Sequence, residues 1–223
     1  MKIKEINRSI KVHIIDAFPD YNLDGYLVYK TFDHDFFIKG YLFYSKGNYE
    51  LGLKVTCFVM PLFKKHNSIT FTHSLDILNI TKVGFFKKIK DCWWDIRPTH
   101  QDETFLKLKD EMHKQGEPML AKINSAKDLC RKIEKSKKYN IRAFEVITYS
   151  SILYGSIKEQ NKLLKGLIRE ANNERDLDWV HQIKAEAELM LSLNSQEERI
   201  ALLKTWANHT ITNLKLPGLK IFE

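Results

Sequence analysis

Residues 49–63 read YELGLKVTCFVMPLF, and the polarity of this stretch changes part-way along. As far as Thr56 the residues alternate as in a half-exposed strand, with Tyr49, Leu51, Leu53 and Val55 on one face and Glu50, Lys54 and Thr56 on the other. After Thr56 both faces are apolar. Such a strand must pack between two layers, against a ligand or against a partner. The fold therefore depends on what covers the second face.

Further strands flank this one. Alternating stretches rich in Tyr, Phe, Val, Ile and Thr predict four strands, over 23–30, 36–44, 49–61 and 68–78. Short turn-like segments separate them, DHD at 33–35, SKGN at 45–48 and KKHN at 64–67. Short connectors favour an antiparallel meander. Pro61 is expected to end the third strand or to mark an edge, because proline has no N–H to donate.

Most of the remaining chain has helical periodicity. Residues 2–17 predict an amphipathic helix, and six more helices are expected over 102–114, 126–138, 141–154, 156–172, 176–193 and 196–213. Residues 82–100 fit neither pattern and are expected to bridge the two halves. This order predicts an α+β fold. Residues 1–100 would form the helix and sheet, and residues 101–223 a region of antiparallel helical hairpins, either packed on the sheet as one domain or separate.

The composition is that of a globular protein. A chain of 223 residues with 43% hydrophobic residues can bury a sizeable core. The sequence has no signal-like segment and no run of eighteen apolar residues, so we expect a cytoplasmic protein without a membrane span. Cys57, Cys92 and Cys130 lie far apart and are expected to be reduced. No cofactor and no metal site are predicted, because the histidines show no paired ligand spacing and the glycines form no phosphate loop.

The positive charge is concentrated in one window. The net charge is +8, which favours association with acidic partners. Residues 122–142 hold eight Lys or Arg against two acids. In a helix over 126–138, one face would carry Lys127, Arg131, Lys135 and Lys138, opposite a stripe of Ala126, Leu129, Cys130 and Ile133. These cations would hold the phosphates of a nucleic acid, and a solvated charged face is the alternative.

Several apolar features point to a protein partner. They are Phe58, Met60 and Phe63 of the two-sided ribbon, Trp93 and Trp94 of the segment CWWDIRPTH, and the apolar helix at 141–155. An apolar surface of this kind is typical of a partner or homo-oligomer interface, and Trp is favoured there. The leading hypothesis is a non-enzymatic interaction protein. The alternative is that one Trp belongs to the core and the other covers a junction, with Arg97 paired to Asp95 or Asp91.

The string RDLDWVH, Arg175 to His181, resembles the Arg-polar-x(3 to 5)-His motif of the HEPN family. In many members of this all-helical family an Arg and a His from two protomers cut RNA. The resemblance implies an RNase that uses Arg175 and His181, with the imidazole transferring protons and the guanidinium stabilising phosphate. It covers seven residues, and the β half is foreign to that fold.

The β half itself, FFIKGYLFYSKGNYELGLKVTCFVMPLF at 36–63, resembles stretches of uncharacterised bacterial α+β proteins, some encoded near phage-defence or toxin-immunity genes. The resemblance implies a binding role in bacterial or phage conflict. It transfers no catalytic residues.

Overall fold

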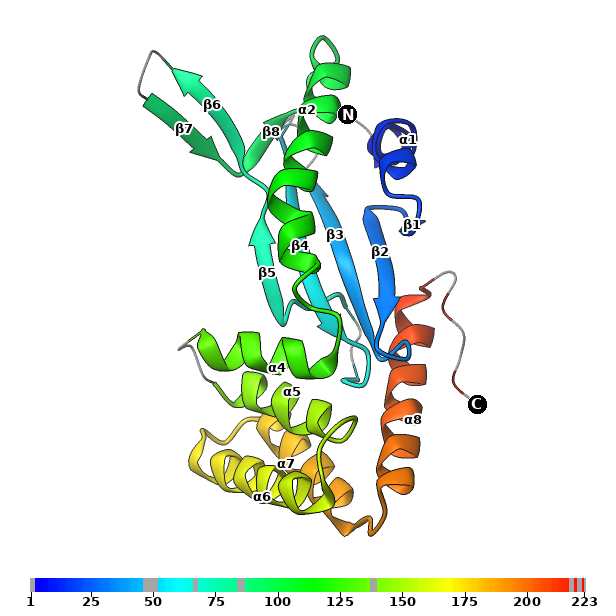
Figure 1. Cartoon of the computed structure of the whole chain (residues 1–223), viewed down its shortest axis with the longest axis vertical. Coiled ribbons are helices and arrows are strands. Elements are labelled where there is room, and N and C mark those ends of the chain that lie inside the picture. Colours follow the sequence, from blue (N-terminus) through cyan, green and yellow to red (C-terminus); the bar gives the residue numbers. More distant parts are fainter. Residues whose placement is uncertain are drawn as a thin grey trace.

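The computed structural model describes residues 3–45, 52–65, 68–83, 87–136 and 140–216, together with Leu219 and Phe222. Helix α1 (Ile3–His13) and a short 3-10 turn (Ile15–Ala17) precede the strands, and helices α2 to α8 follow them (Figure 1). The predicted α+β class, with an N-terminal helix, an antiparallel sheet and a helical second half, is confirmed.

The sheet follows the chain order. Its consecutive strands are β1 (Asn22–Asp24), β2 (Leu27–Phe32), β3 (Phe37–Ser45), β4 (Gly52–Pro61) and β5 (His73–Asp76), and each pairs antiparallel with the next. The predicted antiparallel meander is therefore confirmed, although the strand expected over 23–30 is divided into β1 and β2, and β4 ends at Pro61 as expected. The fourth predicted strand, over 68–78, is shorter in the structure, where only β5 pairs.

The bridging segment adds strands that the sequence did not predict. Strands β6 (Asn79–Val83) and β7 (Lys87–Asp91) form a separate antiparallel ribbon that projects from the body (Figure 1). Strand β8 (Trp93–Asp95) then returns to the main sheet and pairs with the first residues of β4. The chain between the two halves is thus part of the sheet.

The helices of the second half are α2 (Gln101–Glu111), α3 (Glu117–Leu120), α4 (Ala126–Lys135), α5 (Ile141–Ser151), α6 (Ile157–Asn173), α7 (Asp178–Ser192) and α8 (Gln196–Leu214). All six predicted helices are present. The chain also stays helical beyond α2, through a π-helical turn at Met112–Gly116 into the unpredicted α3. Pro118, the second residue of α3, directly follows this π-helical turn, a local distortion of the kind that accompanies proline in a helix.

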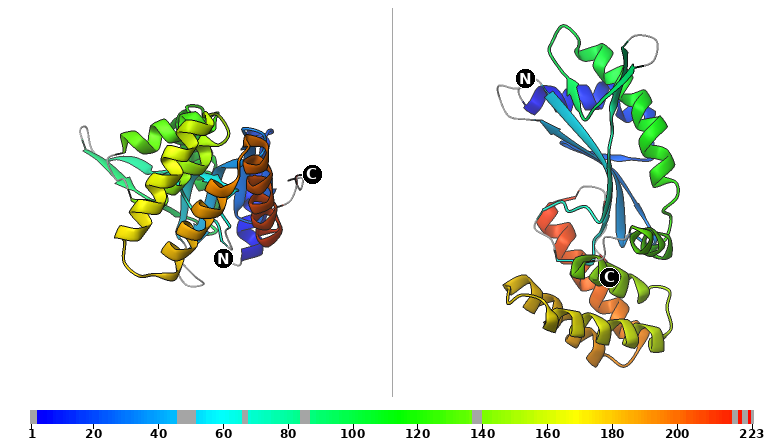
Figure 2. Two further views of the ribbon diagram at one scale, coloured as in Figure 1. Left: turned by 90° about the horizontal axis from the view of Figure 1, so that it is seen from below. Right: turned by 90° about the vertical axis from the view of Figure 1, so that its left-hand side faces the viewer.

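Both faces of β4 are covered by the chain itself. On one face the Cys57 sulfur lies 3.8 Å from the carbonyl oxygen of Gly116 in the π-helical turn. On the other face the Phe58 ring packs against the Phe71 ring, with centroids 5.3 Å apart, and the Thr70 amide donates to the Met60 sulfur. Helices α2 and α8 lie on opposite sides of the sheet (Figure 2, right). The two-sided ribbon is therefore core.

A buried lysine joins the sheet to the helical half. Lys39 of β3 is only 5% exposed, yet its ammonium group donates to the carbonyl oxygens of Leu120 and Ile123 and to the side chain of Asn124, at 3.0, 2.8 and 2.8 Å. Burial lowers the pKa of Lys39, and Lys30 lowers it further. The cation satisfies the carbonyl groups left open where α3 ends.

A tight turn places α4. The predicted turn at Asp33, His34 and Asp35 is confirmed, and all three residues have positive φ, 52°, 54° and 64°. The Asp33 carboxylate accepts a hydrogen bond from the Ala126 amide, at 2.6 Å. Ala126 is the first residue of α4, so this contact fixes the start of that helix against the β2–β3 turn.

The close approach of β2 and β3 yields a test of the sheet. A methyl group at Gly40 would overlap the backbone oxygen of Val28, so we expect Gly40→Ala to lower the free energy of unfolding by about 3 kcal/mol or more. Gly166→Ala on α6 is the control. There the methyl group would meet only the edge of the Phe144 ring, at 3.1 Å, and alanine favours a helix more than glycine does, so we expect a change within about 1 kcal/mol. Urea denaturation measures both. A Gly40→Ala protein of parental stability would contradict the described pairing.

Candidate anion-binding cleft

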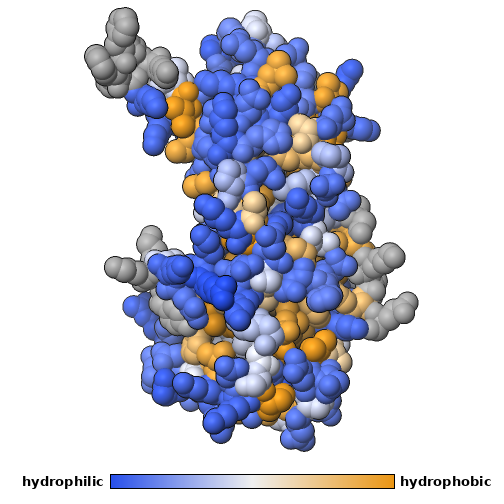
Figure 3. Space-filling model, viewed as in Figure 1, coloured by the Kyte–Doolittle hydropathy of each residue, from blue (hydrophilic) through white to orange (hydrophobic). Residues whose placement is uncertain are grey.

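Helix α4 exposes the predicted cations. Its residues Lys127, Arg131 and Lys135 are exposed, and the stripe of Ala126, Leu129, Cys130 and Ile133 is buried. Lys138 lies outside the described residues. Arg131 is 3.8 Å from Asp128, which offsets part of its charge. In the space-filling view, hydrophilic side chains cover the surface over α4 (Figure 3).

A cleft of about 610 Å³ opens beside the last turn of α4. Its polar lining comes from three parts of the chain that are distant in sequence. These residues are Lys64, Thr70, Thr72, His73, Ser136, Asn140 and Arg142. Within the described ranges, no Asp or Glu lines the cleft. The donors that converge here suit an anionic ligand.

Local capping and strand pairing bring these residues together. The side chain of Asn140 accepts a hydrogen bond from the Ala143 amide, at 2.9 Å, so α5 begins at the cleft with Arg142 in its first turn. The Thr72 amide donates to the carbonyl oxygen of Val59, at 3.0 Å, and His73 is paired with Val59 in the sheet. Strand β4 thereby holds the segment opposite α5.

A buried ion pair lies beside the cleft. The Lys64 ammonium is 2.7 Å from the Glu145 carboxylate, and the two side chains are 10% and 4% exposed. Burial raises the pKa of Glu145, and Lys64 opposes this shift. The next residue, Lys65, lies 3.2 Å from Glu186 of α7. Thr210 of α8 donates to the Lys64 carbonyl oxygen, so the segment after β4 is held by α5, α7 and α8.

Arg142 and His73 supply the other ionisable groups. The Arg142 guanidinium lies over the Trp179 ring, 4.1 Å from its centre, and makes no ion pair with any carboxylate in the described part of the chain. Burial lowers the pKa of His73, and Lys132 lowers it further. At neutral pH we therefore expect an uncharged His73 beside a charged Arg142. The cleft can hold an anion, with Arg142 as its strongest donor.

Four of the five residues expected at a partner surface are in the interior. Phe58, Met60 and Phe63 are 0% exposed and Trp94 is 1% exposed. The expectation that they form a partner surface is therefore corrected, and these four side chains belong to the core. The segment after β4 and the helices of the second half bury them. Trp93 remains partly exposed and packs near Tyr44, with ring centroids 6.3 Å apart.

The apolar helix at 141–155 is also mostly interior. In α5, residues 145–151 are all buried. The Tyr149 ring packs edge-on against Phe63 and Trp206, with centroids 6.3 and 5.3 Å apart. The apolar character of this helix is therefore explained by the fold.

The two candidate catalytic residues of the HEPN-like string lie on the surface. Arg175 precedes α7 and His181 is in its first turn, and both are exposed. The His181 ring contacts the carboxylate of Asp176, the second residue of the motif. Among the described residues, no hydrogen bond joins Arg175 to His181. The RNase role stays a prediction.

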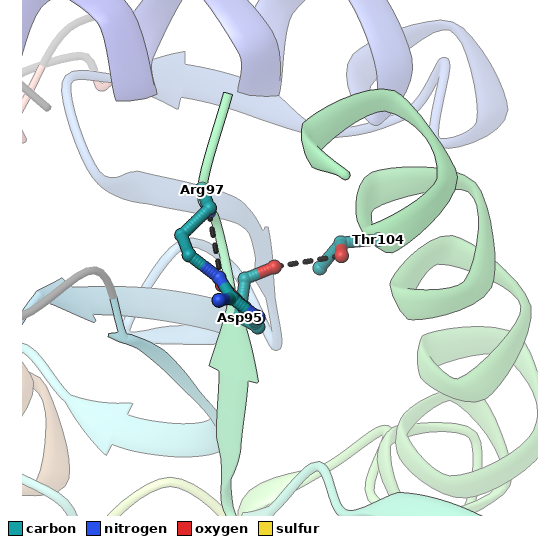
Figure 4. A network of polar contacts seen from close by, with 3 residues as sticks. All are labelled: Asp95, Arg97 and Thr104. Carbon is teal, nitrogen blue, oxygen red and sulfur yellow. Dashed lines mark hydrogen bonds and ion pairs between the residues drawn. The ribbon is translucent and has the colours of Figure 1, made fainter. Parts of the chain in front are cut away.

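Asp95 and Arg97 have a structural role. The Arg97 guanidinium donates to the Asp95 carboxylate, as the alternative interpretation of the sequence expected, and it lowers the pKa of Asp95. The Thr104 hydroxyl donates to the Asp95 carbonyl oxygen, at 2.7 Å (Figure 4). The Thr104 contact holds β8 against α2.

Within the described ranges, no three His, Cys, Asp or Glu side chains gather as a metal site would require. No described helix combines the length and apolar character needed to cross a bilayer.

Two groups of positively charged residues were not predicted from the sequence. Lys64, His73 and Arg142 meet only through tertiary packing, so no local pattern could group them. A second exposed stripe does have a sequence signal, since Lys158, Lys162, Lys165 and Arg169 recur at helical spacing on α6.

Comparison of the chain with protein-family models, curated proteins and solved structures gives no match. A defence or immunity role stays a prediction.

The buried ion pair can be tested by removing its cation. We expect Lys64→Met to lower the free energy of unfolding by about 3 kcal/mol, because it leaves the buried Glu145 carboxylate unpaired, and Lys64→Met with Glu145→Gln to recover most of the loss. Urea unfolding followed by circular dichroism measures both.

The control is Lys158→Met, at an exposed lysine of α6, with an expected change below about 0.5 kcal/mol. If Lys64→Met were as stable as the parent, the ion pair would not anchor the segment after β4.

Proposed function

We propose that the protein binds nucleic acid, with α4 as the main phosphate-binding element. The observation that supports this best is that α4 carries exposed cations and has a cleft at its C-terminal end. The described residues that line this cleft include no Asp or Glu. Polyanion binding depends on clustered Lys and Arg, each of which displaces counterions from a phosphate. The net charge of +8 also favours association with acidic partners such as nucleic acid.

The spacing on α4 suits a strand of phosphates. Lys127, Arg131 and Lys135 recur every four residues, which corresponds to about 6 Å along a helix axis. Each cation can therefore meet a different phosphate along one path. The apolar-partner hypothesis receives less support, because four of its five residues are in the core.

Reversing the charges on α4 tests the proposal. We expect Lys127→Glu, Arg131→Glu and Lys135→Glu, made together, to weaken binding of a labelled single-stranded oligonucleotide at least about tenfold at low salt. The slope of log affinity against log salt should become shallower by about 2, since each contact to a single strand contributes about 0.7. Fluorescence anisotropy across a salt series measures both.

The matched control reverses Lys158, Lys162 and Lys165, which are exposed on α6. It makes the same change in net charge. Equal losses in the two triple variants would show a general charge effect, and a loss confined to the α6 variant would contradict the role of α4.

RNA cleavage is a second candidate function, favoured by the contact between His181 and Asp176. A carboxylate beside an exposed imidazole can orient it for proton transfer. If the protein cleaves RNA, His181→Ala should abolish cleavage, while His209→Ala, at an exposed histidine of α8, should not. Gel analysis of labelled RNA measures this, and cleavage that persists in His181→Ala would exclude the site.

A further inference from the structure

The cleft differs from the two other large cavities that offer cations. One, of about 710 Å³, is lined by Lys158, Lys162 and Lys165, so that α6 alone supplies all its cations. A space of about 530 Å³ between α1 and α2 is lined by Arg8 and His13, but Asp102 also lines it and pairs with His13 at 3.1 Å. In the cleft beside α4, Lys64 pairs with Glu145 and Arg142 has no carboxylate partner among the described residues. Arg142 is therefore held by no ion pair there, although its charge helps to lower the pKa of the neighbouring Glu145.

The donor set matches the oxygens of a phosphate group. The guanidinium of Arg142 presents several N–H donors, and its packing on Trp179 holds it in place. His73, Thr72 and Ser136 add neutral polar groups around the same space. A phosphomonoester carries about −1.5 to −2 charges at pH 7, more than the single charge of a backbone diester, and so gains more from this environment.

The position of the cleft relates it to the path along α4. Ser136, which directly follows α4, lines the cleft, so the cleft lies at the C-terminal end of the helix that carries Lys127, Arg131 and Lys135. Its volume of about 610 Å³ is within the range of pockets that hold small ligands, roughly 300–1,000 Å³, and so is compatible with one nucleotide.

We infer that the cleft binds the terminal phosphomonoester of a nucleic-acid strand that lies along α4. This rests on the proposed nucleic-acid binding. Free mononucleotides carry the same phosphomonoester group, and the experiment below distinguishes them from the end of a strand.

The test compares three versions of one single-stranded oligonucleotide: without terminal phosphate, with a 5′ phosphate and with a 3′ phosphate. We expect one phosphorylated form to bind the full-length protein about tenfold more tightly than the unphosphorylated form, as one added charge-assisted contact would give. Arg142→Gln should reduce this ratio to below about twofold. Arg131→Gln, on the outer face of α4, should weaken all three forms and leave the ratio unchanged.

Equal binding of the three forms by the parent protein would overturn the inference and leave nucleic-acid binding intact. Competition by a nucleoside monophosphate distinguishes the sources. Weak competition supports a strand end, whereas competition as strong as that of the phosphorylated oligonucleotide would overturn it in favour of a nucleotide site.

Failure of the proposed function has a different signature. No oligonucleotide would bind, and isothermal titration with the nucleoside monophosphate alone would then show whether the cleft holds a monoester. If the parent protein gives a binding heat and Arg142→Gln does not, the cleft binds a phosphomonoester but no nucleic-acid strand lies along α4. If the parent gives no heat, both proposals are wrong. Thermal unfolding of Arg142→Gln is the control for folding, and we expect a folded protein because position 142 is exposed.

Discussion

The structure depends on the need to cover a strand that is apolar on both faces. The second half of β4 cannot face water on either side, so the chain must supply a layer to each. The π-helical turn after α2 and helix α3 cover one face, where Gly116 and Met119 contact Cys57. The segment before β5 covers the other, where Phe71 meets Phe58. This requirement places helices on both sides of one sheet.

The same requirement creates the cleft. Because β4 continues directly into the helical half, the Lys64 ammonium is buried beside the Glu145 carboxylate. The positive charge of Lys64 must then compensate the negative charge of Glu145. The segment that returns to β5 then lies opposite the start of α5, and the space between them is lined by Lys64, His73 and Arg142. The Asp33 contact to Ala126 sets α4 beside this space. The cationic site is thus a consequence of how the sheet and helices join.

Local patterns predicted the fold well and the site only in part. Periodicity gave the meander and the faces of α4, because each depends on neighbouring residues. It gave no strand over 79–95, where alternation is obscured by lysines and adjacent Trp residues, and where pairing of β8 with β4 decides the structure. It also could not tell whether Phe58, Met60 and Phe63 are covered by their own chain or by another. The cleft depends on contacts between positions 64 and 142, which no window of sequence spans.

We propose that α4 and the adjoining cleft form one ligand-binding surface. The most direct measurement is a map of backbone amide shifts in ¹H–¹⁵N spectra as a 5′- or 3′-phosphorylated single strand is added. We expect the largest changes at 127–136, 70–73 and 140–143. Changes centred on the cavity between α1 and α2 or on α6, with the cleft unaffected, would contradict it.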